Sequence, residues 1–299
     1  MPLLLDLRHY ETVTAIVDLG TMTAAADALH TTQSALSHRV AEAERRLGTK
    51  LFERSGRRAL RPTQAGLAVH QAAGRALGEL ARCEEVVGSS DEEVEAVVRI
   101  AVGSYDCFHW FPDVLRIAGR ELPAVQLQLV VVGDAPGPAL ADGNADLVIG
   151  LGAPRGSAQP ISLFQDELML MVAPGHRLAR HDRVTADDLA EESYLTYNLN
   201  PSPGFEYDRF IRPAAAYPRL VTVVEKTSAI TELVAAGAGV SILSRWALEP
   251  AVSLGRIAAV RCGDDGLDIT WSAFCRAEEP PGSAARRTAV LLADLLGDR

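Results

Sequence analysis

Near the amino terminus, apolar residues recur at helical spacing. Between Thr32 and Gly48 they stand three or four positions apart, at Leu36, Val40, Ala43 and Leu47. At about 100° per residue this spacing places them on one narrow stripe, which must face a core. Thr32 is a suitable N-cap and Gly48 a suitable terminator, so the pattern predicts a helix that ends near Leu47.

Two shorter helices are predicted before this one. Residues 6–18 present apolar positions at helical spacing, and the Ala-rich run 24–29 follows Thr23, a second candidate N-cap. The small side chains of that run allow another helix to pack closely, and His30 with Thr31 breaks the pattern. After the third helix, residues 51–52 return to the core and residues 53–58 form an Arg-rich turn between short extended segments. The order predicts a winged helix-turn-helix.

A long helix is expected next. Thr63 is an N-cap candidate, and residues 64–87 contain no proline and are rich in Ala, Leu, Gln and Glu. At 1.5 Å per residue such a helix extends about 35 Å, too far to be covered by the preceding module, so we expect it to pair with a second copy of itself. The polar residues 88–93 then predict a hinge.

From about residue 97 onward, strand-like and helix-like runs alternate along the sequence. Strand-like runs occur at 97–102, 125–132, 146–150, 167–173, 194–197, 220–224, 240–243, 256–260 and 269–275. Helix-like runs occur at 112–121, 186–190, 205–212, 228–236 and 283–296. This alternation predicts an α/β domain with largely parallel sheets, whose ligands collect at the carboxyl ends of strands.

The negative net charge of the whole chain argues against nucleic-acid binding, but the charge is distributed unevenly along the sequence. The 299-residue chain carries −10 overall, but residues 1–65 hold nine Lys/Arg and seven Asp/Glu, about +2, and the rest holds 20 and 32, about −12. An acidic protein can bind DNA through a local basic face. No apolar run reaches the roughly 18 residues of a membrane span and the amino terminus lacks the pattern of a signal peptide, so we expect no membrane contact and a cytoplasmic location.

The cysteines do not indicate a structural role. Cys83, Cys107, Cys262 and Cys275 lie far apart without CxxC or Cys/His spacing, so neither a disulfide framework nor a metal site is expected. We expect reduced thiols.

The polar side of the third helix carries the candidate DNA chemistry. Its outward residues are small, hydrogen-bonding or cationic: Ser34, Ser37, His38, Ala41 and Arg45. Such a surface can approach base edges in the major groove closely, and the arginines of the wing turn can bind phosphates. Taken singly, a polar helix face or an Arg-rich turn is also typical of segments that are merely exposed to solvent. The ordered succession of the elements favours DNA binding.

The stretch TAAADALHTTQSALSHRVAEAERRLGTKLFERSGRRALRPTQAG, residues 23–66, resembles the amino-terminal signature of LysR-type transcriptional regulators. The resemblance extends over the full length and implies a winged helix-turn-helix (1–62), a dimerisation helix (63–88) and an effector-binding domain (89–299). That domain would resemble a periplasmic binding protein, with lobe I at 96–162 plus 267–299 and lobe II at 163–266. It further implies homodimers and usually homotetramers, contact with RNA polymerase, no catalytic activity, no cofactor and a small-molecule co-inducer.

Within this family, residues 101–112 and 227–246 look closest to regulators of methionine biosynthesis, which respond to homocysteine. Residues 103–106 depart from the pattern of that branch, so homocysteine stands beside other amino or organic acids as a candidate effector.

The resemblance also implies roles for individual residues. Base-contacting positions fall on Gln33, Ser34, Ser37 and His38. Backbone contacts fall on Thr23, Thr32, Arg54, Arg57, Arg58 and Thr63, where the threonines can equally be caps alone. Loops expected to meet around an effector contribute Ser104, Tyr105, Asp106, Cys107, Tyr197, Asn198, Thr227 and Ser228. A helix that begins with free hydroxyls can accept a carboxylate. Asp106 could bind an ammonium group or simply cap a turn, and we expect Trp110 and Phe108 in the core.

The sequence leaves two other functions open, an enzyme and a redox-sensing regulator. An enzyme could use Cys107 as nucleophile with His109 as base, but side chains at i and i+2 of an extended segment point to opposite faces. A redox-sensing regulator could use Cys107, Cys262 or Cys275, which requires exposed thiols with a lowered pKa.

Overall fold

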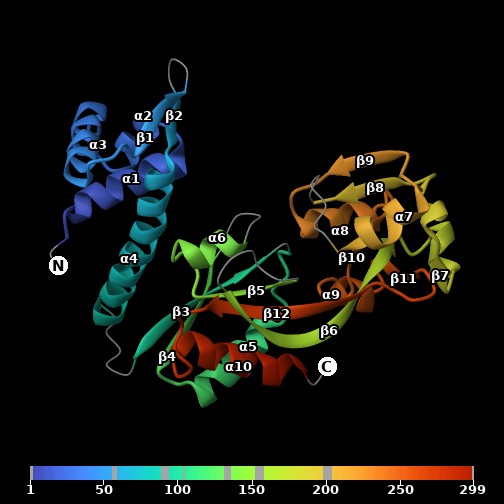
Figure 1. Cartoon of the computed structure of the whole chain (residues 1–299). Coiled ribbons are helices and arrows are strands. Elements are labelled where there is room, and N and C mark those ends of the chain that lie inside the picture. Colours follow the sequence, from blue (N-terminus) through green and yellow to red (C-terminus); the bar gives the residue numbers. More distant parts are fainter. Residues whose placement is uncertain are drawn as a thin grey trace.

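The computed structural model describes residues 3–55, 59–88, 94–103, 105–130, 136–151, 158–197 and 204–297. A small helical unit at the amino terminus is joined by one long helix to an α/β unit that makes up the rest of the chain (Figure 1).

The amino-terminal unit is a winged helix-turn-helix. It consists of α1 (Leu7–Leu19), α2 (Met22–Ala28), α3 (Gln33–Leu47) and an antiparallel hairpin of β1 (Phe52–Ser55) and β2 (Ala59–Pro62). Its core takes one face from each helix, with Val13, Ala25 and Leu36 fully buried. The predicted order of elements is therefore confirmed.

The cap of α2 was predicted two residues too late. Thr21 accepts a hydrogen bond from the Ala24 amide at 3.1 Å, whereas Thr23 lies inside the first turn. Both threonines carry a hydroxyl, and the extended backbone of Thr21 decides which one caps. The other two caps are confirmed: Thr32 accepts from the Ala35 amide and Thr63 from the Gly66 amide, each at 3.1 Å.

The long helix α4 (Gln64–Gly88) begins where Thr63 predicts and connects the two units. Its first turns pack against α1, and further along it contacts β3 (Ala96–Val102) and α6 (Pro136–Ala141) of the α/β unit. The helix thus lies against both units of its own chain (Figure 1).

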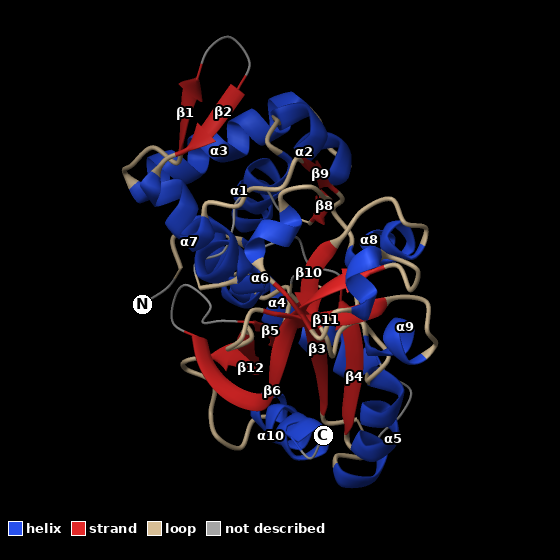
Figure 2. Cartoon of the chain, turned by 90° about the vertical axis from the view of Figure 1, so that its right-hand side faces the viewer, coloured by secondary structure: helices blue, strands red, loops and turns tan. Residues whose placement is uncertain are grey.

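Lobe I of the α/β unit is built on a mixed sheet in the order β4-β3-β5-β12-β6. Its remaining strands are β4 (Val125–Val130), β5 (Leu147–Leu151), β6 (Ala158–Val172) and β12 (Asp268–Arg276). The helices α5 (Phe111–Glu121) and α10 (Ala284–Gly297) lie together beside this sheet (Figure 2). The fully buried side chains include Trp110, Leu147 and Trp271.

Lobe II shares β6 with lobe I. The second half of β6 pairs with β10 (Ser241–Ser244) and β11 (Ala258–Cys262), and β11 also pairs with β7 (Arg183–Val184). A separate parallel pair is formed by β8 (Ser193–Thr196) and β9 (Leu220–Val223). The helices α7 (Arg212–Ala214), α8 (Thr227–Ala235) and α9 (Glu249–Ser253) complete the lobe. Short helical turns are η1 (Arg177–Arg180), η2 (Ala186–Leu189) and η3 (Tyr207–Ile211).

The expectation of largely parallel sheets is wrong. The pairs β3-β4, β3-β5, β11-β7 and β8-β9 are parallel, but β6 and β12 run antiparallel to the strands beside them. These two long strands connect the lobes, and the sequence pattern recognised only the second part of β6. Among the described residues, no helix is long and apolar enough to cross a membrane.

Candidate DNA-binding and effector sites

The third helix separates a buried face from an exposed one. Leu36, Val40 and Ala43 are buried, and Leu47 is half-buried against the same core, as predicted. The four residues expected to read bases are all exposed: Gln33, Ser34, Ser37 and His38. The short side chains of this face allow the helix to approach a groove floor, where amide, hydroxyl and imidazole groups can donate and accept hydrogen bonds.

A buried carboxylate, missed by the sequence analysis, fixes the wing against this helix. Glu44 accepts hydrogen bonds from the amides of Leu51 at 3.0 Å and Phe52 at 3.3 Å, and from Lys50 Nζ at 2.6 Å. It therefore joins α3 to the start of the hairpin. A polar residue beside the predicted apolar stripe was the only signal for it.

The residues expected to contact the DNA backbone lie in the wing and at helix caps. Arg54 lies in β1, and Arg57 and Arg58 lie outside the described residues. The Thr63 hydroxyl donates to the Lys50 carbonyl at 2.7 Å while it accepts from Gly66, so it joins the helix to the wing. Thr23 and Thr32 are exposed.

In the effector domain, the predicted loops from the two lobes meet. The Asp106 carboxylate, from the loop after β3, accepts hydrogen bonds from the Ser228 amide at 2.8 Å and from the Ser228 and Thr227 hydroxyls. The Asp106 amide donates to Thr227 Oγ1 at 3.2 Å. These donors lower the pKa of Asp106 despite the opposing effect of its partial burial. Hence the first turn of α8 holds a carboxylate of its own chain.

A second contact between the lobes involves Tyr105. Its hydroxyl accepts from the Ser244 amide at 3.0 Å, and its ring lies 5.8 Å from that of Tyr197 and 5.5 Å from that of Trp271 between centroids. The expectation that Tyr105 and Tyr197 come together is confirmed. Ser104 and Asn198, the other members of these loops, lie outside the described residues.

An aspartate that the sequence analysis missed supports this region. Asp166 of β6 accepts from Ser244 Oγ at 2.6 Å and from Trp271 Nε1 at 3.0 Å, and from the Trp246 amide at 3.2 Å. The Trp246 ring packs 4.9 Å from Trp271, and its buried Nε1–H has no hydrogen-bond partner among the described residues. A buried donor of this kind usually has an acceptor, in the protein or in water.

Glu206, at the start of the turn η3, is a further acidic group that the sequence did not single out. It is half-buried, and burial raises its pKa to about 7. Its charge raises the pKa of Tyr105, Tyr194 and Tyr197 after the larger effect of their own burial, so it lies near these side chains.

The thiols do not support reactive chemistry. Burial raises the pKa of Cys107 and of Cys262 to about 12, and that of Cys275 to about 11. A thiol needs a lowered pKa and access to solvent to act as a nucleophile or redox sensor. Only Cys83 of the four is exposed. The described residues also contain no group of three or more His, Cys, Asp or Glu side chains placed to hold a metal ion.

Of the two aromatic residues that we expect in the core, Trp110 is buried and Phe108 is exposed. Trp110 is fully buried, with its indole N–H donating to the Cys107 carbonyl at 2.9 Å, as expected for the core. The expectation for Phe108 is wrong, because this ring is 44% exposed. It stands in the turn that precedes α5, where the backbone leads Trp110 inward and leaves Phe108 at the surface.

Taken together, an exposed reading helix with a wing and a two-lobed domain with converging polar loops define a ligand-responsive DNA-binding protein. Two protein-family models match the chain. The family described as "Bacterial regulatory helix-turn-helix protein, lysR family" matches residues 7–67, and the family described as "LysR substrate binding domain" matches residues 91–296. The chain belongs to the LysR family of bacterial transcriptional regulators.

Named relatives agree with this assignment. The transcriptional regulator MetR of Salmonella typhimurium strain LT2 is 32% identical over 271 residues, which cover 90% of this chain and 83% of that protein. The regulatory domain of MetR from N. meningitidis matches with a TM-score of 0.54 at 27% identity, over 67% of this chain and 93% of that one. The structure of CbnR, at 22% identity, has a TM-score of 0.67 and covers 98% of this chain and 100% of its own, which shows the shared fold.

Proposed function

We propose that this regulator recognises its promoter sequence through Gln33, Ser34, Ser37 and His38, and that an amino acid or small organic acid modulates it. The main support for this proposal is that all four residues are exposed on α3, whose opposite side is buried. A bidentate pair from Gln33 to adenine would contribute about 1 to 3 kcal/mol of discrimination. We further propose that it acts in the cytoplasm and contacts RNA polymerase there.

For the effector, homocysteine is the first candidate because of the similarity to proteins named MetR. The polar groups that meet between the lobes support a small polar ligand there, with Tyr105, Asp106, Thr227 and Ser228 as its neighbours. Since Asp106 already occupies the first turn of α8, an incoming carboxylate would compete with it for the same donors.

Self-association through α4 is the third part of the proposal. One face of this helix packs on α1 and another on lobe I, whereas a third face exposes small and apolar residues at heptad-like spacing. That face consists of Ala72, Ala76, Leu80, Cys83 and Val87, of which the last two also border a pocket between α4 and β3. Leu80 is 50% exposed and Val87 is 79% exposed, so a second copy of α4 would bury surface that is costly to leave in water. The dimer is the basis for the tetramer that we expect.

The test of DNA recognition is selection from a random duplex library, followed by affinity measurements on the selected and a scrambled sequence. Gln33→Ala and Ser37→Ala should lower affinity for the selected duplex by about tenfold and leave the scrambled duplex unaffected. Gln71→Ala, an exposed glutamine of α4, is the matched control. Equal loss on both duplexes would refute the assignment of these residues.

The test of the effector is a thermal-shift screen of the full chain with L-homocysteine, methionine and short organic acids. A ligand that binds only the native state raises Tm, by an amount that grows with the logarithm of its concentration above Kd. A shift with L-homocysteine alone would support the candidate, and a shift with another compound would replace it.

A further inference from the structure

Two glycines of α4 lie against the backbone of lobe I. A Cβ atom at Gly74 would lie 2.6 Å from the carbonyl oxygen of Asp142, and one at Gly78 would lie 2.9 Å from that of Gly143. These distances are shorter than any normal carbon–oxygen contact. The helix and the turn after α6 therefore touch backbone to backbone, which only residues without side chains permit.

The turn in lobe I requires glycine as well. Gly143 has a φ of +75°, in the left-handed region, and a Cβ there would lie 3.1 Å from the Gly74 carbonyl oxygen. Its own carbonyl is held by Arg99, whose Nη2 donates at 2.7 Å. The lobe I side of the contact is consequently fixed and cannot move aside for a larger residue on α4.

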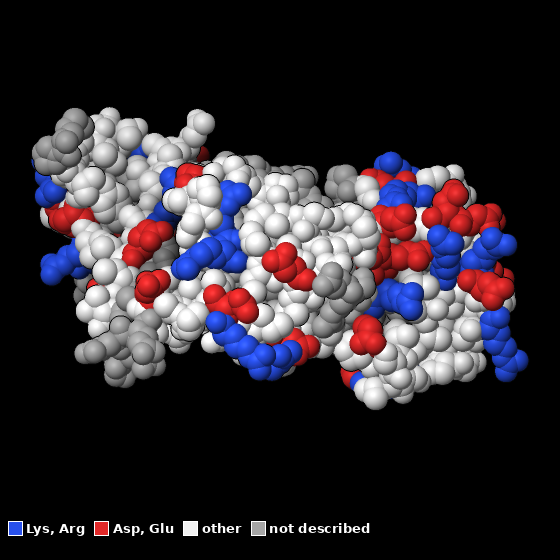
Figure 3. All heavy atoms as spheres, turned by 90° about the horizontal axis from the view of Figure 1, so that it is seen from below, with Lys and Arg blue, Asp and Glu red and all other residues white. Residues whose placement is uncertain are grey.

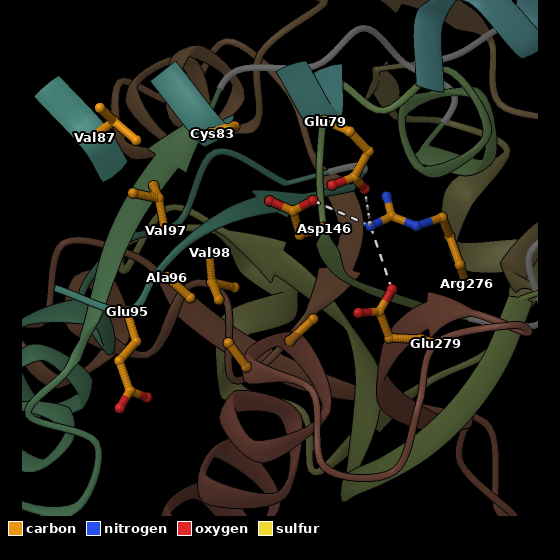
Figure 4. Close-up of a pocket in the computed structure, with 12 residues that line it drawn as sticks. Glu79, Cys83, Val87, Glu95, Ala96, Val97, Val98, Asp146, Arg276 and Glu279 are labelled. Carbon is orange, nitrogen blue, oxygen red and sulfur yellow. Dashed lines mark hydrogen bonds and ion pairs between the residues drawn. The ribbon is translucent and has the colours of Figure 1, made fainter. Parts of the chain in front are cut away.

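Ion pairs surround the glycines but contribute little. Arg276 of β12 lies 3.3 Å from Asp146 and 3.3 Å from Glu279, both in lobe I, and 3.9 Å from Glu79 of α4 (Figure 4). A second pair across the contact, Arg75 with Glu278, is 4.0 Å long and exposed. In the two pairs that cross the contact the acid, Glu79 or Glu278, is largely exposed, and exposed pairs are worth about 0 to 1 kcal/mol each. The fit of the glycines is therefore the tighter constraint on how the two surfaces meet.

Beyond the glycines the helix separates from the lobe. Glu79, Cys83 and Val87 line one side of a pocket of about 430 Å³, and β3 lines another (Figure 4). Backbone-to-backbone contact is made at the turns around Gly74 and Gly78, whereas the last turns of α4 face β3 across this pocket.

We propose that Gly74, Gly78 and Gly143 are positioning residues that hold lobe I on α4 of the same chain, and that this contact fixes the placement of the DNA-binding unit relative to the effector domain. The inference rests on the proposed function. A contact that depends on the fit of two surfaces can be released when the lobes rearrange around an effector.

The test variant is the double substitution Gly74→Ala with Gly78→Ala. Each methyl group would meet a backbone oxygen and force the surfaces apart, while alanine favours the helix itself by about 1 kcal/mol per site. Gly119→Ala is the matched control, since Gly119 is an exposed helical glycine of α5 with nothing within 4 Å of its Cβ position. Circular dichroism checks that all variants fold, and Gly78→Ala alone is the milder alternative.

Two readouts are needed. Hydrogen–deuterium exchange of residues 136–146 should accelerate several-fold in the double variant, and the footprint on the selected duplex should change in length while half-site affinity stays constant. Unchanged exchange, or faster exchange with a wild-type footprint, would overturn the inference. Failure of the proposed function would look different, because the wild-type protein would then select no duplex, whereas the exchange experiment would still report on the contact.

Discussion

Among single residues, Asp106 has the most informative surroundings. It comes from lobe I, yet its carboxylate accepts three hydrogen bonds from the first turn of a lobe II helix. From the sequence, Asp106 and Thr227 could each be assigned to an effector loop. The bond between them could not be foreseen, because the two residues lie far apart in the chain and no local pattern pairs them.

Asp106→Ala should lower the free energy of unfolding by about 1 to 3 kcal/mol, since the Ser228 amide and two hydroxyls lose an acceptor that is charged. Equilibrium urea unfolding measures this. Asp113→Ala, at a half-exposed acid in the first turn of α5, is the control and should change stability much less. Equal effects of both substitutions would contradict the role given to Asp106.

Glu206 predicts a dependence of stability on pH. Its pKa is raised by burial to about 7, above its ordinary value of 4.5, so the native state binds a proton that the unfolded chain releases. Stability from this group is present below pH 4.5 and is lost as pH rises toward 7, by about 1.4 kcal/mol per pH unit at most. Glu206→Gln should thus raise Tm at pH 8 but not at pH 4. A variant that loses stability at pH 8 would contradict this.

Individual elements differ in how much of them the sequence determines. The helices of the winged unit, the caps of α3 at Thr32 and of α4 at Thr63, and the buried stripe of α3 follow from spacing within one turn or two, and the sequence predicts them. The strand β6 was recognised only in part. It pairs with β12 along its first part and with β10 and β11 along its second part. The spacing of apolar residues along a strand does not indicate which strand it pairs with.

The exposed face of α4 leads to a prediction about assembly. Leu80→Asp would place a charge in the middle of the face that we assign to a second copy, and burying an unpaired charge is costly. We expect the sedimentation coefficient to fall to that of a smaller species at micromolar concentration. Leu254→Asp, at a 76% exposed leucine in lobe II, is the control and should sediment like the wild type. Unchanged sedimentation of Leu80→Asp would contradict pairing through this face.

For the whole molecule, charge is distributed by function. The residues after 65 carry all of the excess of acid, and in lobe II many acidic side chains pair with arginines, including Glu192 with Arg177 and Glu167 with Arg261. On the face that Figure 3 shows, blue and red side chains are intermixed at this end of the molecule. We therefore expect phosphate binding to be confined to the winged unit, while the acidic remainder opposes non-specific contact with DNA.

Communication between the two units is tested by a substitution far from the DNA. Thr227→Val with Ser228→Ala removes both hydroxyls that connect lobe II to Asp106, and leaves the Ser228 amide in place. We expect normal affinity for the selected duplex and no change of that affinity or of the footprint when L-homocysteine, or whichever compound shifts the wild-type Tm, is added. The physical reason is that a ligand can shift an arrangement only through its different affinity for the two states. Thr222→Val, on the strand β9 in lobe II, is the control that should retain the response. A full response in the double variant would move the effector to another part of the domain, whereas loss of DNA affinity without ligand would show that the lobe contact supports the DNA-binding unit directly.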